Sequence, residues 1–356
     1  MLYSLGGLLK NYFGPARLLQ SYSVLNVLAL YVSFLIVRFS MPCFYGFFPH
    51  DRGREFTVSA EAARGKPTGS GIYFITVFVI LSFVFVPLDW FKCSVLVLTW
   101  IMMLTGYLDD RSVSSWGEYT KGLLDFVVSL AASILLAIYL KQTSPSGSIV
   151  FWLPFLSGTL SVNPAFFVVI SVILLWASIN TTNCTDGVDG LSSTLVLLGL
   201  LTIAVIFYFI LGHIDIASYL LVPHLANGAS WATMTFCLSG ALMGYLWHNA
   251  FPSKVLMGDA GSRALGFYIG ICVMLSGNPF LIFATSSIIF VNGGMGLMKV
   301  FLKRFFHINI FASIRFPLHD HMRINHGWSP TQVLIKFLIM QILITVAVLG
   351  IFFKIR

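Results

Sequence analysis

The chain has 356 residues, of which 58% are hydrophobic and only 10% are charged, and its formal net charge is +8. A soluble domain carries about 25% charged residues, so the composition excludes an ordinary soluble protein. The apolar residues occur in runs of about 20, which is enough to cross a bilayer as a helix. We therefore expect an all-α integral membrane protein with a single domain over residues 1–356. No basic domain is present, so the positive charge does not indicate nucleic-acid binding.

A bundle of about ten transmembrane helices is predicted, and the first apolar run is a span because it lacks a cleavage site. The expected spans lie near residues 22–41, 71–88, 91–107, 121–140, 165–180, 191–211, 231–248, 262–277, 279–300 and 331–353. An even number of spans places both termini on one side of the membrane. Segment 141–164 contains Pro145, Gly147 and Pro154, and it predicts a hairpin or re-entrant piece on the outer membrane surface.

The charged residues indicate which side of the membrane each loop occupies. One set of loops, with the adjoining span ends, holds 15 of the 21 Lys and Arg residues and ten of the 13 acidic residues. This set comprises loops 42–70, 108–120, 181–190, 249–261 and 301–330. The positive-inside rule makes these loops cytoplasmic and places both termini outside. Every polar cluster described below lies on this side, which predicts one cytoplasmic site.

The central polar stretch, residues 180–191, lies between two long apolar runs. Its amide and carboxylate side chains recur every three residues, and they are Asn180, Asn183, Asp186 and Asp189. Gly187 and Gly190 allow the backbone to turn and approach a ligand closely. This composition predicts that a polar ligand binds here. Two Asn-x-Thr glycosylation sites are the alternative interpretation, and the cytoplasmic placement argues against them.

Two further clusters precede the central stretch. Residues 64–71 combine three glycines with Lys66, Thr68 and Ser70, which is typical of a phosphate cradle or of a flexible basic loop. Asp109 and Asp110 close the third span. Adjacent carboxylates repel each other unless a cation offsets them, so this pair indicates either a cation site or a solvated helix end.

Asp259 lies between Gly258 and Gly261, just before a predicted helix. Free N–H groups at a helix N-terminus suit an anion, and the carboxylate could hold a divalent cation beside it. A simple helix cap would explain Asp259 but not the neighbouring Asn249 and Lys254.

A histidine cluster lies in the last inner loop, at His319, Asp320 and His321. These residues could bind zinc, but no third ligand at a suitable spacing is evident. Contacts to phosphate or to metal-bound water suit the pattern better. Scattered surface histidines remain the alternative.

At these residues the chain resembles the polyprenyl-phosphate N-acetylhexosamine-1-phosphate transferases. That family has Lys-Pro-Thr, Asp-Asp, Asn-x-x-Asn-x-x-Asp-Gly-x-Asp-Gly, Gly-Asp-x-Gly-Ser and late His motifs, and all five occur here in order. The Pro-Leu-His and Gly-Trp segments look most like the bacterial phospho-N-acetylmuramoyl-pentapeptide transferases. Those enzymes join UDP-N-acetylmuramoyl-pentapeptide to undecaprenyl phosphate, giving lipid I and UMP for peptidoglycan synthesis.

The resemblance implies roles for residues that match the motifs. Asp259 would bind Mg²⁺, and Asp109 and Asp110 would lie at the phosphoryl-transfer centre as further candidate ligands. His319 and His321 would complete the catalytic group. The substrates would contact Lys66, Thr68, Lys121, Asn180, Asn183, Asp186, Asp189, Asn249 and Gly258. A homodimer in the bacterial plasma membrane is also implied.

Two positions depart from the family pattern. Asp320 replaces the middle histidine of a His-His-His motif, and Leu256 replaces a Phe before Met-Gly-Asp that would stack on uracil. A sister enzyme that transfers GlcNAc-1-phosphate from UDP-GlcNAc therefore stays open. A membrane transporter is a third hypothesis, which predicts acids at mid-membrane depth and repeated halves. Here the acids of the polar clusters lie at span ends, Asp125 lies within a span, and no internal repeat is visible.

Overall fold

The computed structural model describes residues 1–53, 64–112, 114, 116–144, 146–156 and 158–354. The elements up to the middle of the chain are α1 (Leu2–Leu9), the 3₁₀ helices η1 (Gly14–Gln20) and η2 (Met41–Phe47), α2 (Tyr22–Ser40), α4 (Gly71–Phe85), α5 (Trp90–Arg111), α6 (Glu118–Thr143), β1 (Ile149–Trp152), β2 (Thr159–Val162) and α7 (Pro164–Thr185). The remaining elements are α8 (Leu191–Val205), the π-helical turns η3 (Ile206–Leu211) and η4 (Phe290–Gly294), α9 (Ile214–Tyr219), α10 (Gly228–Asn249), α11 (Gly258–Leu275), α12 (Leu281–Ile289), α13 (Met295–Phe306), α14 (Leu318–His326) and α15 (Pro330–Lys354).

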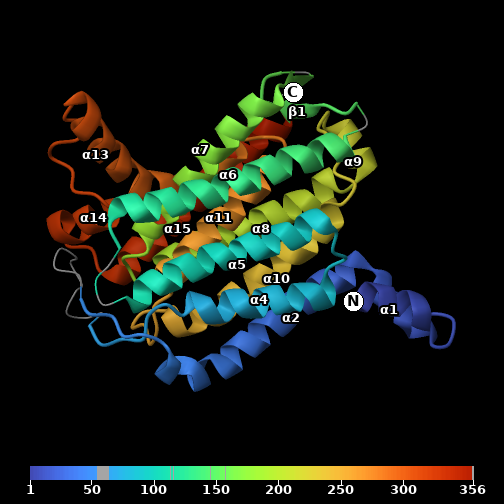
Figure 1. Ribbon diagram of the computed structural model, residues 1–356, viewed down its shortest axis with the longest axis horizontal. Helices are drawn as coiled ribbons and strands as arrows, with labels where there is room; N and C mark the ends of the chain where they lie inside the picture. The colour runs from blue at the N-terminus through green and yellow to red at the C-terminus, as the bar shows by residue number, and fades with distance from the viewer. Residues whose placement is uncertain (54–63, 113, 115, 145, 157, 355–356) are drawn as a thin grey trace.

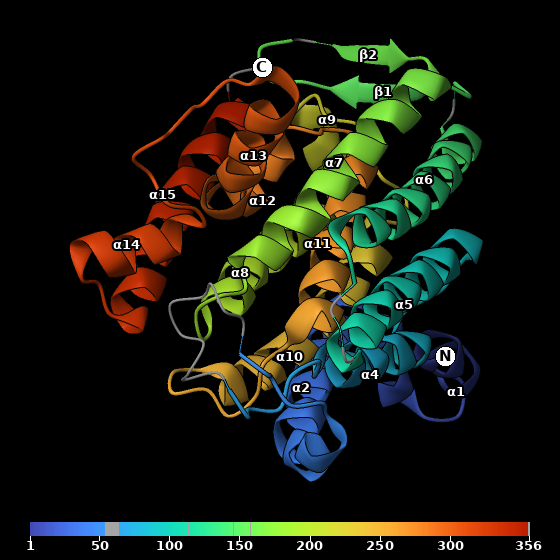
Figure 2. The ribbon, with the colours of Figure 1, turned by 60° about the vertical axis from the view of Figure 1, so that its left-hand side comes forward.

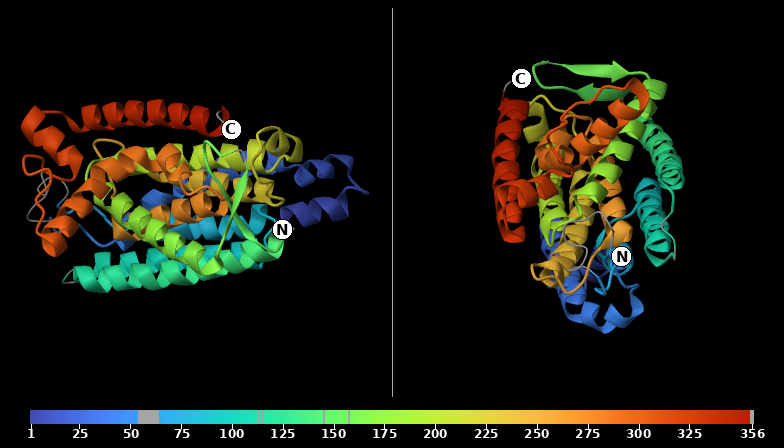
Figure 3. Two further views of the ribbon diagram at one scale, coloured as in Figure 1. Left: turned by 90° about the horizontal axis from the view of Figure 1, so that it is seen from above. Right: turned by 90° about the vertical axis from the view of Figure 1, so that its left-hand side faces the viewer.

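Helices α10 and α11 form the centre of the bundle (Figures 1 and 2). Helix α11 packs against α5 and α7, and α10 packs against α2 and α8. Every residue of α11 from Asp259 to Leu275 is buried. Because other helices surround α10 and α11, these two helices can carry small and polar residues that a lipid-facing helix could not. The viewpoint of Figure 3 (left) places α14 at one end of the bundle and both termini toward the other end.

Seven helices within the described ranges are long and apolar enough to cross a membrane, and α4 is a shorter apolar helix. The expectation of a multi-span helical membrane protein is therefore confirmed. Each of the ten expected spans coincides with one helix or with consecutive helical segments. For α4, α10 and α11 the crossing itself stays a prediction. The shielding of α10 and α11 by their neighbours explains their lower apolar content.

Several helices extend beyond the apolar runs that predicted them. Helix α5 continues to Arg111, so Asp109 and Asp110 belong to its last turn. Helix α7 continues to Thr185, so Asn183, which was expected in loop 181–190, is a helical residue. The expected spans ended where polar residues began. A helix inside a protein bundle can continue, because its polar side chains find partners on other helices.

The expected span 279–300 is divided into three parts. Ser286 departs from helical geometry with φ −145°, and the π-helical turn η4 then separates α12 from α13. Such turns are frequent at functional sites, and Asn292 of this turn contacts His319, as described below. The hairpin expected within 141–164 is confirmed: β1 pairs antiparallel with β2, with Ile149 opposite Val162.

Close packing between α2 and α10 depends on glycine. A Cβ atom at Gly240 would lie 2.1 Å from the carbonyl oxygen of Leu30. We expect Gly240→Ala to destabilise the protein by about 1–3 kcal/mol, because the two backbones must separate. A melting temperature several degrees below wild type in detergent would show this. Gly350→Ala is the matched control, because a Cβ atom there would meet no other part of the described chain within 4 Å beyond its own helix backbone. An equal loss in both variants would contradict the packing argument.

Candidate active site

The polar residues of the predicted site come from helix ends that converge at one end of the bundle. Lys121 of α6 connects two of the carboxylates. Its Nζ atom forms an ion pair with Asp109 Oδ2 and lies 3.0 Å from Asp259 Oδ2. The side chains of Asp109 and Asp259 are only 4% and 3% exposed, and the backbone N–H of Trp116 donates to Asp109 Oδ1 at 2.6 Å. Three charged groups from α5, α6 and α11 therefore form one buried centre.

Asp110 has a different position from its neighbour. Its carboxylate accepts hydrogen bonds from the backbone N–H groups of Asp259 at 3.1 Å and Ala260 at 3.0 Å. Asp110, which belongs to α5, thus caps the N-terminus of α11. A negative charge is favourable at a helix N-terminus. Gly258 has φ +68°, and a Cβ atom there would lie 2.3 Å from Asp110 Oδ2. Asp110 and Gly258 together hold the turn that presents Asp259.

A cavity of about 500 Å³ opens beside Asp259. Its lining contains eight of the predicted site residues, and these are Lys66, Thr68, Asn183, Asp186, Asp189, Asn249, Gly258 and Asp259. Asp109 and Lys121 adjoin it through Asp259. The lining also contains Val188, Phe251, Pro252 and Leu256. A lining that combines polar and apolar side chains suits a ligand with a flat ring and charged groups.

The loop after α10 is joined to the central stretch by side chains. Asp189 accepts from the backbone N–H of Ser253 at 3.0 Å and from its hydroxyl at 2.8 Å. Lys66 Nζ donates to the same hydroxyl at 3.0 Å and lies 3.7 Å from Asp189. Asn249 accepts from Gly190 N–H and donates to Val255 O, both at 2.9 Å. Asn249, at the end of α10, therefore links the central stretch to the loop after α10.

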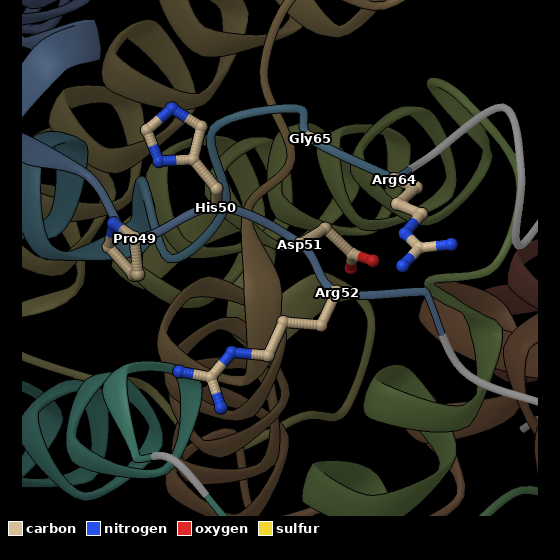
Figure 4. A pocket seen from close by; sticks show the side chains of 6 residues that line it. All are labelled: Pro49, His50, Asp51, Arg52, Arg64 and Gly65. Atoms are coloured by element: carbon tan, nitrogen blue, oxygen red, sulfur yellow. The ribbon is translucent and has the colours of Figure 1, made fainter.

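Segments 49–51 and 65–68 pair with each other and position Lys66 and Thr68. Asp51 N–H donates to Lys66 O at 2.8 Å, and Thr68 N–H donates to Pro49 O at 2.7 Å. A second cavity, of about 620 Å³, lies beside this pair and shares Asp51 with the first. Figure 4 shows Arg64 and Asp51 pointing toward each other and Arg52 pointing away from them.

His319 is buried behind the central stretch. Its backbone N–H donates to Asn292 Oδ1 at 2.8 Å, and its Nδ1 lies 3.0 Å from Asn292 Nδ2. A Cβ atom at Gly187 would lie 2.5 Å from His319 Nε2, so Gly187 allows the ring to contact the loop. Burial, and secondarily Arg323, lowers the pKa of His319 to about 3. The ring is therefore neutral at pH 7.

Neutral burial of His319 makes stability depend on pH. The unfolded chain binds this proton with a pKa of about 6.5 and the folded chain with a pKa of about 3. The native state therefore loses stability as the pH falls below 6.5, by at most about 2 kcal/mol at pH 5. We expect the drop in melting temperature between pH 7 and pH 5 to be smaller in His319→Gln than in wild type. Equal drops in the two proteins would contradict the assignment.

The other residues of the histidine cluster lie in different surroundings. Burial raises the pKa of Asp320, although the positive charges of Arg315 and Arg323 act to lower it. His321 Nδ1 accepts from Arg315 N–H at 3.3 Å, and its ring lies 5.6 Å from that of His326. His321 is absent from the described cavity lining, as is His319. Their expected contact with substrate stays a prediction.

Sequence reasoning missed Arg323, Ser253 and Phe251, which line the cavity. Arg323 follows His319 by four residues in α14, and such residues share a helix face, whereas a residue two positions on does not. Treating this segment as a loop hid that relation. Asn180 was expected at the substrate, but its Nδ2 donates to Trp176 O at 2.9 Å and to Asp125 Oδ2 at 3.3 Å. Asn180 is not among the residues described as lining the cavity.

Helix ends that bring buried carboxylates, a lysine and a glycine-flanked turn to one cavity are typical of a phosphate-handling membrane enzyme. The chain belongs to glycosyl transferase family 4, whose sequence profile matches residues 92–277, from the first turn of α5 to the end of α11. The family resemblance stated from the motifs is thereby confirmed.

The chain is similar to phospho-N-acetylmuramoyl-pentapeptide-transferases. It is 53% identical to the one from Treponema pallidum (strain Nichols) over 348 residues, which cover 98% of this chain and 95% of that protein. It is 29% identical to the one from Campylobacter curvus over 88% of this chain and 90% of the relative. The identity to the one from Helicobacter pylori (strain HPAG1) is also 29%, with coverages of 96% and 97%.

Proposed function

We propose that this chain transfers phospho-N-acetylmuramoyl-pentapeptide from UDP-N-acetylmuramoyl-pentapeptide to undecaprenyl phosphate, giving lipid I and UMP. The observation that carries the proposal is the 53% identity to a phospho-N-acetylmuramoyl-pentapeptide-transferase over 98% of the chain. The site geometry agrees with this reaction, because Asp259 lines the cavity and forms a charged centre with Asp109 and Lys121.

Mg²⁺ fits this centre. Within the described part of the chain, no group of three or more His, Cys, Asp or Glu side chains could hold a metal ion alone. Mg²⁺ needs no such group, because it is commonly held by one or two carboxylates together with substrate phosphates and water. Asp259 and Asp109, both buried beside Lys121, would supply those carboxylates. Asp110 is already used by the N-terminus of α11. When bound, Mg²⁺ would neutralise charge that develops on the diphosphate.

The chain's own residues would bind and orient the two substrates. An oxygen of undecaprenyl phosphate attacks the β-phosphorus of the UDP-sugar, and the bond from that phosphorus to the bridging oxygen breaks, so UMP leaves. Lys121 and Lys66 would stabilise the phosphate charge, and Arg323 adds a third cation to the cavity wall. Phe251, which is 56% exposed, offers an aromatic ring near Leu256. The nucleotide would occupy the cavity bounded by Asn183, Asp186 and Asp189.

The membrane orientation is also part of the proposal. The loops of the site carry most of the Lys and Arg residues, so the positive-inside rule favours a cytoplasmic site and outside termini in the bacterial plasma membrane. The lipid tail must stay in the bilayer while its phosphate reaches Asp109. A homodimer is a further expectation, by resemblance.

UMP release from purified protein in detergent tests the proposal. Undecaprenyl phosphate and Mg²⁺ would be supplied, and UDP-N-acetylmuramoyl-pentapeptide and UDP-GlcNAc would be compared in parallel. Release with the pentapeptide substrate alone is expected. Release with UDP-GlcNAc alone would assign the sister activity and would draw attention to Asp320 and Leu256. Absence of release with both, in folded protein, would contradict the transferase function.

A further inference from the structure

A second pair of opposite charges lies one helical turn deeper than Lys121 and Asp259. Arg263 of α11 donates through Nε and Nη2 to Asp125 Oδ1 of α6, with Nε at 3.2 Å. Both side chains are 1% exposed. Burying two charges carries a large desolvation cost that their attraction often does not repay, so a buried pair is weak evidence for a gain in stability. The pair therefore calls for another explanation.

The two charge pairs form a ladder between α6 and α11. Lys121 and Asp125 are four residues apart on α6, and Asp259 and Arg263 are four residues apart on α11. Residues at this spacing lie on the same face of a helix. Both helices begin at the site. Along α6 the positive residue, Lys121, comes before the negative one, whereas along α11 the negative residue, Asp259, comes before the positive one.

This order of charges selects one register. If α6 slid by one turn, about 5.4 Å, like charges would face each other. In one direction Asp125 would meet Asp259, and in the other Lys121 would meet Arg263. Buried polar pairs that fix the register between helices are known from coiled coils.

Apolar packing between α6 and α11 does little to fix that register. Helix α6 packs against α7 and α5, and it touches α11 only lightly. The contact with α7 includes Asn180, whose Nδ2 lies 3.3 Å from Asp125 Oδ2. Asp125 therefore contacts both α7 and α11. It lies one helical turn after Lys121, the residue that α6 contributes to the site.

We propose that Asp125 and Arg263 are positioning residues: they fix the register of α6 so that Lys121 Nζ stands between Asp109 and Asp259. Asn180 orients the Asp125 carboxylate within this arrangement. The catalytic consequence rests on the proposed function. The position of Lys121 can be tested by a measurement that does not depend on the proposed function.

The first test replaces the pair by apolar residues, in Asp125→Leu/Arg263→Met. A well-packed apolar replacement of a buried ion pair is often neutral or stabilising, so the melting temperature should equal or exceed that of wild type. We nevertheless expect the turnover number to fall by about tenfold to hundredfold, because a misplacement of about 1 Å in an active site can cost about a hundredfold. Wild-type turnover in this variant would overturn the proposal.

The second test asks whether the effect passes through Lys121. The same double change is made in Lys121→Gln protein, and it should cause no further loss of turnover, because interacting sites are not additive. A further loss of the same factor would identify a general structural defect and overturn the proposal. Arg263→Lys, which keeps the charge, should retain more turnover than the apolar pair.

A third readout does not depend on turnover. Amine acetylation, followed by mass spectrometry, should modify Lys121 severalfold faster in the apolar pair than in wild type. Lys66 is the matched control, since its side chain is 25% exposed and that of Lys121 is 24% exposed. Unchanged labelling of Lys121 would overturn the proposal. If wild-type protein released no UMP, the proposed function would be contradicted. The labelling of Lys121 would still decide whether Asp125 and Arg263 position that lysine.

Discussion

Asp259→Asn should reduce UMP release by about a thousandfold or more, the effect of removing a central charge from a buried reaction centre. Asp259 supplies one of the two carboxylates that meet at Lys121, and its side chain is 3% exposed. Asparagine keeps the size of the side chain but carries no charge for Mg²⁺ or for Lys121. The backbone N–H at this position still donates to Asp110, so the melting temperature should change little. The two measurements together separate loss of chemistry from loss of fold.

Asp215→Asn is the control for this prediction. Asp215 is an exposed residue of α9, at the far end of the bundle from α14 (Figure 1), and its change should leave both measurements at wild-type values. If Asp259→Asn retained turnover within tenfold of wild type, Asp259 would not be the principal carboxylate at the centre.

The sequence predicts the meeting of the site loops better than the roles of single residues. Lys66, Thr68, Asn183 and Asp189 come from distant segments, and they line one cavity as expected. The spacing of glycines and the polar residues at span ends indicate that these segments meet. Which residues share a helix face depends on helical limits that hydropathy does not give, as the contrast between His321 and Arg323 shows.

Adjacent residues in the Asp-Asp pair illustrate the same limit. Neighbouring residues of a helix do not point in the same direction, so the pair cannot act as one two-carboxylate ligand. Asp109 turns toward Lys121, whereas Asp110 caps α11. Neither direction can be read from the sequence, because each depends on where α6 and α11 lie relative to α5. The buried pair of Asp125 and Arg263 was hidden for the same reason.

The separate position of Asp109 leads to the second large effect. Asp109→Asn should lower turnover by about 10²–10³-fold, since it removes a preorganised charge from the centre. We expect this factor to be the same at pH 7 and at pH 9. The attacking group is a phosphate monoester with a second pKa of about 6, so it is largely dianionic at pH 7 without a general base. Asp109 would then act by holding Lys121 and Mg²⁺ in place.

The pH profile of UMP release distinguishes this role from proton removal. If Asp109 were the base for the lipid phosphate, the variant would recover toward wild-type turnover at high pH, where hydroxide removes the proton instead. Recovery of that kind would contradict the positioning role. A constant ratio between variant and wild type above pH 7 would support the positioning role, because Asp109 contacts Lys121 directly through an ion pair.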